Sequence, residues 1–137
     1  MTLIEVLVTL VIISVGLLGV AALQITTVRN NQDAYVRSQA AMLAGDMLDR
    51  MRANRTDTAG NSKADRYEVA IDDDPPDTPE GEQVASWRRV LDAQLPGGKG
   101  AIEYDASTNL VTITIQWGER ARREADRTLT FVTNSTI

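Results

Sequence analysis

The sequence contains neither cysteine nor histidine. These absences exclude a thiolate nucleophile, a disulfide, a cysteine-ligated zinc site and a histidine general base. They do not select a redox compartment, because a protein without cysteine works in either an oxidising or a reducing one. Aromatic residues are also scarce, with one Phe, two Trp and three Tyr. The core must therefore be built mainly from Leu, Ile, Val, Met and Ala.

A clustered basic surface is also missing. The 137 residues carry a formal charge of −5, whereas nucleic-acid binding normally needs a basic face that displaces counterions from phosphates. The sequence therefore gives no direct indication of a nucleic-acid partner. It also has no glycine-rich phosphate loop and no paired acids in an apolar cleft. We expect a structural protein rather than an enzyme, with no cofactor and no metal.

The hydrophobic residues are concentrated at the N-terminus. From Leu3 to Ile25 nearly every residue is apolar or small, and Glu5 is the only charge. As a helix this stretch is about 35 Å long, enough to cross a bilayer core of about 30 Å. No Lys or Arg precedes the run, which is also too long for a secretory signal. Because a membrane anchor normally has a basic flank, one explanation is that a basic leader has been removed before residue 1.

Glu5 is the unusual residue of this segment. A carboxylate within a membrane-spanning helix costs several kcal/mol and marks a functional site by default. The alternative is that Glu5 lies close enough to the helix end to reach the lipid headgroups. Its position alone leaves both interpretations open.

The first residues, Met1-Thr2-Leu3-Ile4-Glu5-Val6, resemble the start of mature type IV pilins and pseudopilins, where Phe is usual at the position of Met1. The resemblance implies that a prepilin peptidase cleaves before Met1 and methylates its amine. It also implies that Thr2 and Glu5 serve assembly, with Glu5 neutralising the N-terminal amine of a neighbouring subunit. A buried carboxylate and ammonium are tolerated when they are paired. Such a pair fixes the axial register between subunits.

The apolar segment has features expected of a filament core. Leu3, Leu7 and Leu10 recur at roughly helical spacing, although all faces of a core helix are expected to pack. Gly16 and Gly19 interrupt the segment, each at a cost of up to about 1 kcal/mol relative to Ala. They indicate either close helix packing or a segment that loosens in the filament. In this family a proline is common in such a loosened stretch, and this chain has none there.

The helix is predicted to continue to about residue 55. Residues 1–28 form its transmembrane or filament-core half, and residues 29–55 form an amphipathic half that belongs to a globular part, 29–137. The apolar stripe of the second half includes Val36, Leu43, Met47 and Met51. Turn-forming residues at 54–61 end the helix.

An acidic loop at 71–82 is predicted to be solvated and poorly ordered. A calcium site is the alternative, but the spacing of the acids does not fit an EF-hand. Thr78 and Pro79 are typical of a helix start and predict a second helix at about 79–95, on which Trp87 anchors the core. Pro96-Gly97-Gly98 ends this helix.

A β-meander is predicted at 101–133, with strands at 101–105, 110–117 and 128–133. Ile113, Ile115 and Trp117 alternate with polar residues and point to one face. Short connections favour antiparallel pairing against the long helix. The fold class is therefore α+β, which agrees with the type IV pilin fold that the resemblance implies. The charged loop 118–127 contains Arg120, Arg122, Arg123 and Arg127 and either docks an acidic neighbour or is simply solvated.

Later motifs resemble the PilV-type minor pilins, most specifically Asp49-Arg50-Met51-Arg52-Ala53-Asn54-Arg55, with further similarity at 34–44, 87–98 and 111–117. The resemblance implies a subunit that joins other minor pilins and the major pilin on an inner-membrane assembly platform. Such a complex primes assembly and supports adhesion, twitching motility or DNA uptake. The implied location is the inner membrane, with the globular part in the periplasm, and then the pilus. A type II secretion pseudopilin and a major pilin remain alternatives.

Overall fold

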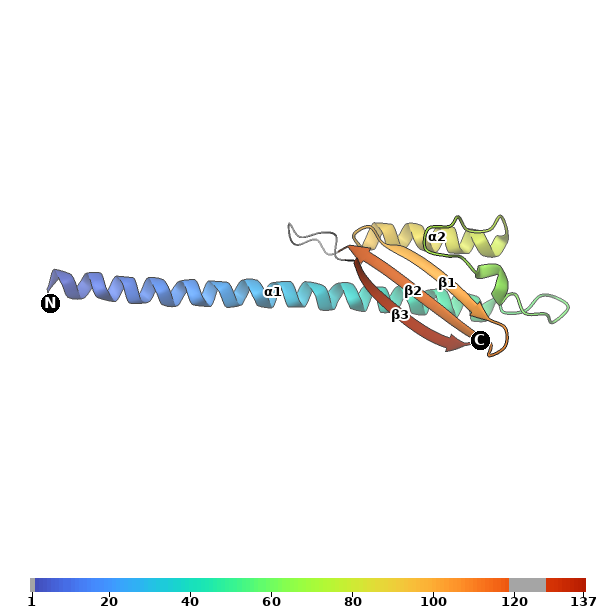
Figure 1. Cartoon of the computed structure of the whole chain (residues 1–137), viewed down its shortest axis with the longest axis horizontal. Helices are drawn as coiled ribbons and strands as arrows, with labels where there is room; N and C mark the ends of the chain where they lie inside the picture. Colours follow the sequence, from blue (N-terminus) through green and yellow to red (C-terminus); the bar gives the residue numbers. More distant parts are fainter. Residues whose placement is uncertain (1, 119–127) are drawn as a thin grey trace. The chain divides into compact units, whose positions relative to one another are not determined.

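The computed structural model describes residues 2–118 and 128–137. In chain order it contains α1 (Leu3–Ala53), the short 3₁₀-helix η1 (Ala64–Tyr67), α2 (Pro79–Gln94), β1 (Lys99–Asp105), β2 (Leu110–Gly118) and β3 (Thr128–Thr136) (Figure 1). The predicted α+β fold is confirmed: a long N-terminal helix, a shorter helix and a three-stranded antiparallel sheet. The chain divides into two compact units, the N-terminal unit (Met1–Tyr35) and the head unit (Val36–Ile137).

The N-terminal unit consists of the apolar part of α1. Because an α-helix satisfies its backbone polar groups internally, it is suited to an apolar environment. Four hydroxyls in this part, those of Thr9, Ser14, Thr26 and Thr27, donate to the backbone carbonyl four residues earlier. Thr9 Oγ1 donates to the carbonyl of Glu5 and Ser14 Oγ to that of Leu10, each at 2.7 Å. Among the described residues, α1 is the one helix that is long and apolar enough to cross a membrane.

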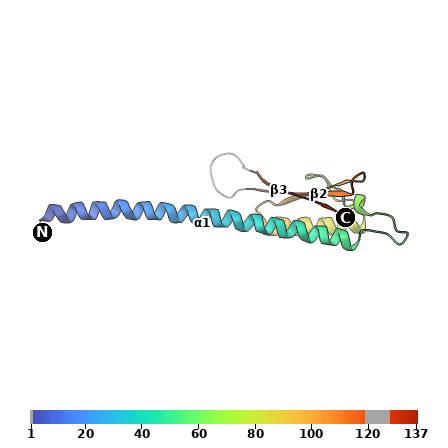
Figure 2. The ribbon, with the colours of Figure 1, turned by 90° about the horizontal axis from the view of Figure 1, so that it is seen from below.

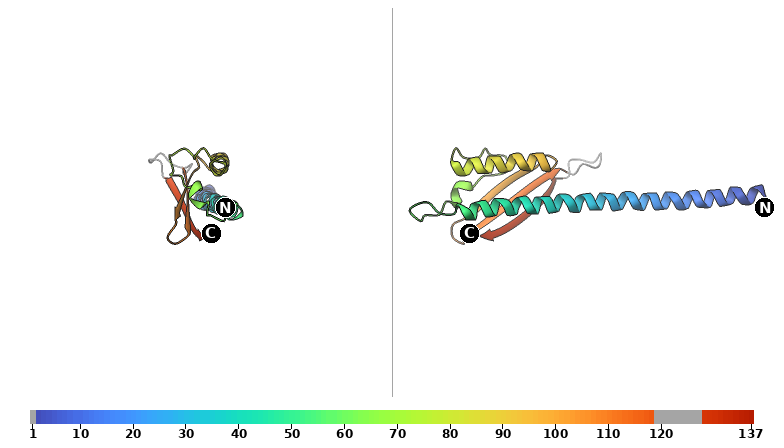
Figure 3. Two further views of the ribbon diagram at one scale, coloured as in Figure 1. Left: turned by 90° about the vertical axis from the view of Figure 1, so that its right-hand side faces the viewer. Right: turned by 180° about the vertical axis from the view of Figure 1, so that it is seen from behind.

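The head unit is built around the sheet, whose strand order is β1-β2-β3. Both neighbouring pairs are antiparallel, with Ile102 opposite Ile113 and Ile115 opposite Phe131. Within this unit, α2 and the head part of α1 lie on one face of the sheet (Figures 2 and 3). In β2 every second side chain is buried, because the pleat turns alternate residues towards the helices.

The core of the head unit is formed by both helices, the sheet and the segment between the helices. Its largest fully buried side chains include Trp87, Tyr67, Met47 and Met51. The Trp87 indole N–H donates to the carbonyl of Leu43 at 2.9 Å, so its polar atom is satisfied within the core. Gly100 makes room for this ring, because a Cβ atom at Gly100 would lie 2.3 Å from Trp87.

The ends of α2 follow from the local sequence. Thr78 Oγ1 accepts a hydrogen bond from the Gly81 N–H at 3.0 Å, and Pro79 is the first helical residue. Residues 79–82, which the sequence pattern assigned to both the acidic loop and the helix, form the first turn. The helix ends at Gln94 with Leu95 as its C-cap, and Gly97 adopts a φ of +60° just beyond it, a conformation that favours glycine.

Two basic side chains, Arg88 and Lys99, attach the acidic loop to the rest of the head unit. The Arg88 guanidinium donates to the carbonyls of Ala70, Asp73 and Gly100. Lys99 Nζ also pairs with Asp72 Oδ1 at 2.6 Å. Desolvation lowers the pKa of Arg88, while the nearby aspartates oppose this shift. The sequence pattern did not predict these attachments. Over the described residues, no cluster of three or more potential ligands is arranged to hold a metal ion.

Candidate functional site

The N-terminal unit exposes a large apolar surface, formed by the side chains of α1 from Leu3 to Val28. Leu3 is 81% exposed and Leu18 is 71% exposed. Soluble monomers rarely leave so much contiguous apolar surface in water, and such a surface marks contact with protein or membrane. The exposed large side chains are Leu3, Ile4, Val6, Leu7, Val8, Leu10, Val11, Ile12, Ile13, Val15, Leu17, Leu18, Val20, Leu23, Ile25 and Val28. The set includes Leu3, Leu7 and Leu10, for which filament packing is predicted.

Glu5 is the charged residue of this surface and lies in the first turn of α1. Its backbone N–H donates to the Thr2 carbonyl at 3.0 Å, so Thr2 closes the first turn of the helix. A carboxylate in the first turn interacts favourably with the helix dipole. Across residues 2–118 and 128–137, no group donates a hydrogen bond to the Glu5 carboxylate or forms an ion pair with it. Met1 and its predicted processing lie outside the described residues.

Several small and polar residues of the apolar helix share one face with Glu5. Thr9, Gly16 and Gly19 follow at spacings of four, seven and three residues, and helical residues three, four or seven apart are neighbours on one face. A Cβ atom at Gly16 or Gly19 would meet nothing within 4 Å. No contact with a described residue of this chain therefore requires glycine at either position. The sequence analysis followed the apolar residues and missed this face, which plotting the polar and small residues on a helical wheel reveals.

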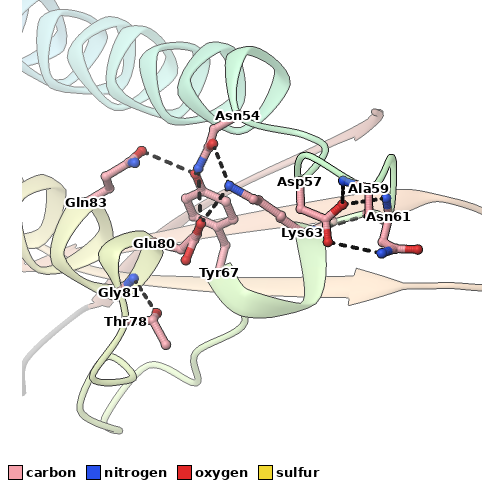
Figure 4. A network of polar contacts seen from close by, with 12 residues as sticks. Asn54, Asp57, Ala59, Asn61, Lys63, Tyr67, Thr78, Glu80, Gly81 and Gln83 are labelled. Atoms are coloured by element: carbon pink, nitrogen blue, oxygen red, sulfur yellow. Dashed lines mark hydrogen bonds and ion pairs between the residues drawn. The ribbon is translucent and has the colours of Figure 1, made fainter.

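A second polar cluster lies in the head unit, where the chain leaves α1. Asn54 Nδ2 donates to the Tyr67 hydroxyl at 2.8 Å and to Glu80 Oε1 at 3.3 Å. Lys63 Nζ donates to Asn54 Oδ1 at 3.1 Å and pairs with Glu80 Oε1 at 3.4 Å. The Tyr67 hydroxyl donates to Gln83 Oε1 at 3.3 Å. This network joins the end of α1, the segment after it and the first turn of α2 (Figure 4).

Glu80 is the central acid of this network and is only 3% exposed. Desolvation raises the pKa of Glu80, but hydrogen bonds from its own backbone N–H, Lys63 and Asn54, with the charge of Lys63, outweigh it. The net effect is a pKa below the ordinary value. No buried side-chain polar atom among the described residues lacks a partner. The network therefore stabilises the head unit, and its geometry offers no reacting group.

The residues predicted to pack the globular part lie at the core of the head unit. Seven of them are buried, and Val36 is partly buried against the same cluster. The buried ones are Leu43, Met47, Met51, Trp87, Ile113, Ile115 and Trp117. The predicted docking arginines Arg120, Arg122, Arg123 and Arg127 lie outside the described residues.

The long apolar helix, the shorter helix and the three-stranded antiparallel sheet make up a pilin-like α+β fold. Residues 22–70 match the family described as Tt1218-like, type IV pilin Tt1218, over a little more than a third of the chain. No curated protein and no solved structure matches the chain. The family match therefore shows that residues 22–70 are similar to the type IV pilins.

Proposed function

We propose that this chain is a type IV pilin, and specifically a minor pilin of the PilV type, which joins a complex that initiates pilus assembly. The observation that carries the proposal is the continuous exposure of apolar side chains on α1 from Leu3 to Val28, with the single carboxylate Glu5 in its first turn. Residues 1–28 span the inner membrane before assembly, and the globular part, 29–137, lies in the periplasm. The helix then leaves the membrane and packs into the filament, driven by an ATPase elsewhere in the machinery.

In this proposal, residues at the N-terminus fix the axial register between neighbouring subunits of the filament. Prepilin peptidase removes a leader and methylates the amine of Met1. In the filament, Glu5 pairs with the corresponding amine of a neighbouring subunit, which removes the cost of an isolated charge in an apolar core. Thr2, Thr9, Gly16 and Gly19 lie at or near the same face and allow a neighbouring helix to approach closely.

The minor role is supported by the residues at the end of α1. The run from Asp49 to Arg55 has the greatest similarity to the PilV-type minor pilins and lies within the family match of residues 22–70. The partners in this role are other minor pilins, the major pilin and the inner-membrane assembly platform. The complex then supports adhesion, twitching motility or DNA uptake at the cell surface.

Deletion of the gene tests the role directly. We expect few or no pili, restored by the wild-type gene but not by Glu5→Gln, and the subunit in sheared pili at far fewer copies than the major pilin. The matched control is Glu103→Gln, an exposed carboxylate in the head unit, which should restore piliation. Normal piliation after deletion contradicts the proposal. Loss of type II secretion with normal pili indicates a pseudopilin, and a copy number equal to that of the filament subunit indicates a major pilin.

A density map of the filament addresses Gly16 and Gly19. Unbroken helix from Leu10 to Ile25 rules out a segment that loosens on assembly and favours close packing at the two glycines. Extended backbone in this stretch supports loosening, at the point where helix propensity is lowest.

A further inference from the structure

The two edges of the sheet in the head unit differ. At the β1 edge, Ile102 exchanges two backbone hydrogen bonds of 2.9 Å with Val69. At the same edge, the Gly100 carbonyl accepts a hydrogen bond from Arg88 Nε at 2.8 Å. The β1 edge is therefore largely closed by residues of the head unit itself. An edge closed in this way cannot accept a further strand over most of its length.

No described residue pairs with the outer edge of β3. The Ile137 N–H donates to the Asn109 carbonyl, which sets the alternation of the antiparallel ladder. Residues 129, 131, 133 and 135 then direct their backbone groups to β2, and the intervening residues direct theirs outward. The outward set is Thr128, Thr130, Val132, Asn134 and Thr136. Throughout the described parts of the chain, nothing forms a backbone hydrogen bond with these outward groups.

This edge also lacks the usual protection against strand pairing. Proteins commonly guard an exposed edge with charged side chains, proline or a β-bulge. The nine residues of β3, TLTFVTNST, include neither a charge nor a proline. Their pairing with β2 continues without a bulge from Thr128 to Thr136. The side chain of Val132, whose backbone groups point outward, is 54% exposed.

We propose that the outer edge of β3 binds an extended segment of a different pilin subunit, which adds a fourth strand to the sheet. The row of backbone donors and acceptors selects an extended chain, because only a strand matches their spacing. The uncharged side chains at the edge fit a segment whose neighbouring residues are also uncharged. This inference rests on the proposed function, since it gives the minor-pilin complex a specific contact.

A second copy of this chain does not fit the edge. Two β3 strands related by a two-fold axis would pair antiparallel. Within the head unit, β3 and the head part of α1 run in the same sense (Figure 1), so the head parts of α1 in such a pair would run in opposite directions. A filament is built from subunits in one orientation by head-to-tail contacts, which a two-fold pair does not provide. The alternative of β3 against the β1 edge of a second copy is blocked, because β1 is closed by Val69 and Arg88.

A photo-crosslinking amino acid at Thr130 tests the contact in cells that assemble the pilus. We expect the full-length chain to form a cross-link with a different pilin, identified by mass spectrometry through its N-terminal apolar helix. The linked residue should lie in an extended segment of that partner. The same amino acid at Thr114, on the outer sheet face but in the central strand, is the positional control and should give little product.

Val132→Pro separates backbone pairing from mere proximity. Proline removes the outward N–H of Val132, which plays no part in the ladder with β2, and should abolish most of the Thr130 cross-link. Val132→Thr keeps this N–H and should retain the cross-link. Folding of both variants is checked by hydrogen exchange, with slow exchange of the Phe131 and Thr133 amides as the criterion. A third variant, Asn134→Lys, places a charge at the edge and should reduce the product if proline proves disruptive.

Three results overturn the inference: no cross-link above the Thr114 level, a cross-link only between copies of this chain, or an undiminished cross-link in folded Val132→Pro. The outcome is separable from that of the proposed function. Loss of piliation on gene deletion without a Thr130 cross-link retains the minor-pilin role and rejects the edge. A specific cross-link to another pilin, together with normal piliation after gene deletion, retains the contact at the β3 edge and rejects the minor-pilin role in assembly.

Discussion

The two units of this chain treat apolar side chains in opposite ways. In the head unit, the side chains of Trp87 and Leu91 are at most 1% exposed, and other residues of the core cluster cover them. In the N-terminal unit, the large apolar residues from Leu3 to Val28 are all exposed. The head unit is therefore stabilised from within, whereas the N-terminal unit needs a membrane or neighbouring helices to cover it.

The charged residues show the same contrast. Glu80 is buried, and Lys63 and Asn54 of the same chain satisfy it. Glu5 lies in the apolar segment, and no described residue of this chain satisfies it. A buried carboxylate is costly unless it is paired. The difference is the one that the proposed pairing of Glu5 with a neighbouring subunit requires, while Glu80 completes the fold of the head unit.

The largest expected effect is on assembly, from Glu5→Gln. The neutral amide cannot balance a partner's ammonium, and loss of one partner of a buried pair costs about 3–5 kcal/mol. Incorporation into pili should fall by about 100-fold or more, with membrane levels unchanged. Quantitative mass spectrometry of sheared pili and membranes measures both. An equal loss with Glu103→Gln would show that the effect is not specific to the N-terminal unit.

Trp87→Ala should have the converse effect and destabilise the head unit. Removal of a large buried side chain costs about 3–5 kcal/mol, and here the hydrogen bond to the Leu43 carbonyl is lost as well. Urea unfolding of the full chain in detergent, followed by the remaining Trp117, measures the change. Met42→Ala is the control, because Met42 is 71% exposed and should change the free energy of unfolding by less than about 0.5 kcal/mol. Similar costs for the two variants would contradict the assignment of the core.

Glu80→Gln should reduce stability by about 1.5–3 kcal/mol near neutral pH, the range for hydrogen bonds to charged groups. Because the pKa of Glu80 is lowered in the folded state, its stabilisation is present above its ordinary pKa and is lost as the pH falls through the lowered value. The difference between wild type and variant should therefore shrink in acid. Unfolding at pH 7 and at successively lower pH measures it.

The unfolding free energy of the variant is compared with that of the wild type at each pH, because other acids also contribute to the pH dependence. Hydrogen bonds, chiefly from Asn61 and Ser107, lower the pKa values of Asp57 and Asp105. Glu82→Gln, at an exposed position in the same turn of α2, is the matched control. A difference that grows as the pH falls would show that Glu80 is not held as a paired carboxylate.

Thr78→Ala should have the smallest effect, a loss of about 1 kcal/mol. The Thr78 hydroxyl accepts the Gly81 N–H that would otherwise lack a partner at the start of α2. Thr78→Ser keeps the acceptor and should be nearly neutral. The thermal midpoints of the two variants decide between them, and equal midpoints would mean that the cap contributes little.

Most of the fold was predictable because its signals are periodic. The α+β class was read from the apolar stripe that ends at Met51, the alternation from Val111 to Trp117, and the cap and breaker residues around 79–98. The network of Asn54, Lys63 and Glu80 was not predictable, because its members are distant in sequence and carry no periodic signal. Glu80 falls within both the predicted acidic loop and the predicted second helix, and its burial in the first turn of α2 has no sequence signal.

The candidate site was predictable in part for the same reason. A single charge in a long apolar run identifies Glu5 without any structure. The open edge of β3 could not be found from the sequence, because it depends on which strand lies outermost and on the closure of β1 by Val69 and Arg88. Strand order and edge closure are tertiary facts that a residue pattern does not encode.

The most direct test of a subunit whose N-terminus carries the assembly contact is mass spectrometry of this chain recovered from sheared pili. We predict a chain that starts at Met1, with a methylated α-amine, and that depends on prepilin peptidase. A chain that retains residues before Met1, or that carries a formylated or unmodified amine and never leaves the membrane, would contradict the proposed role of Met1 and Glu5.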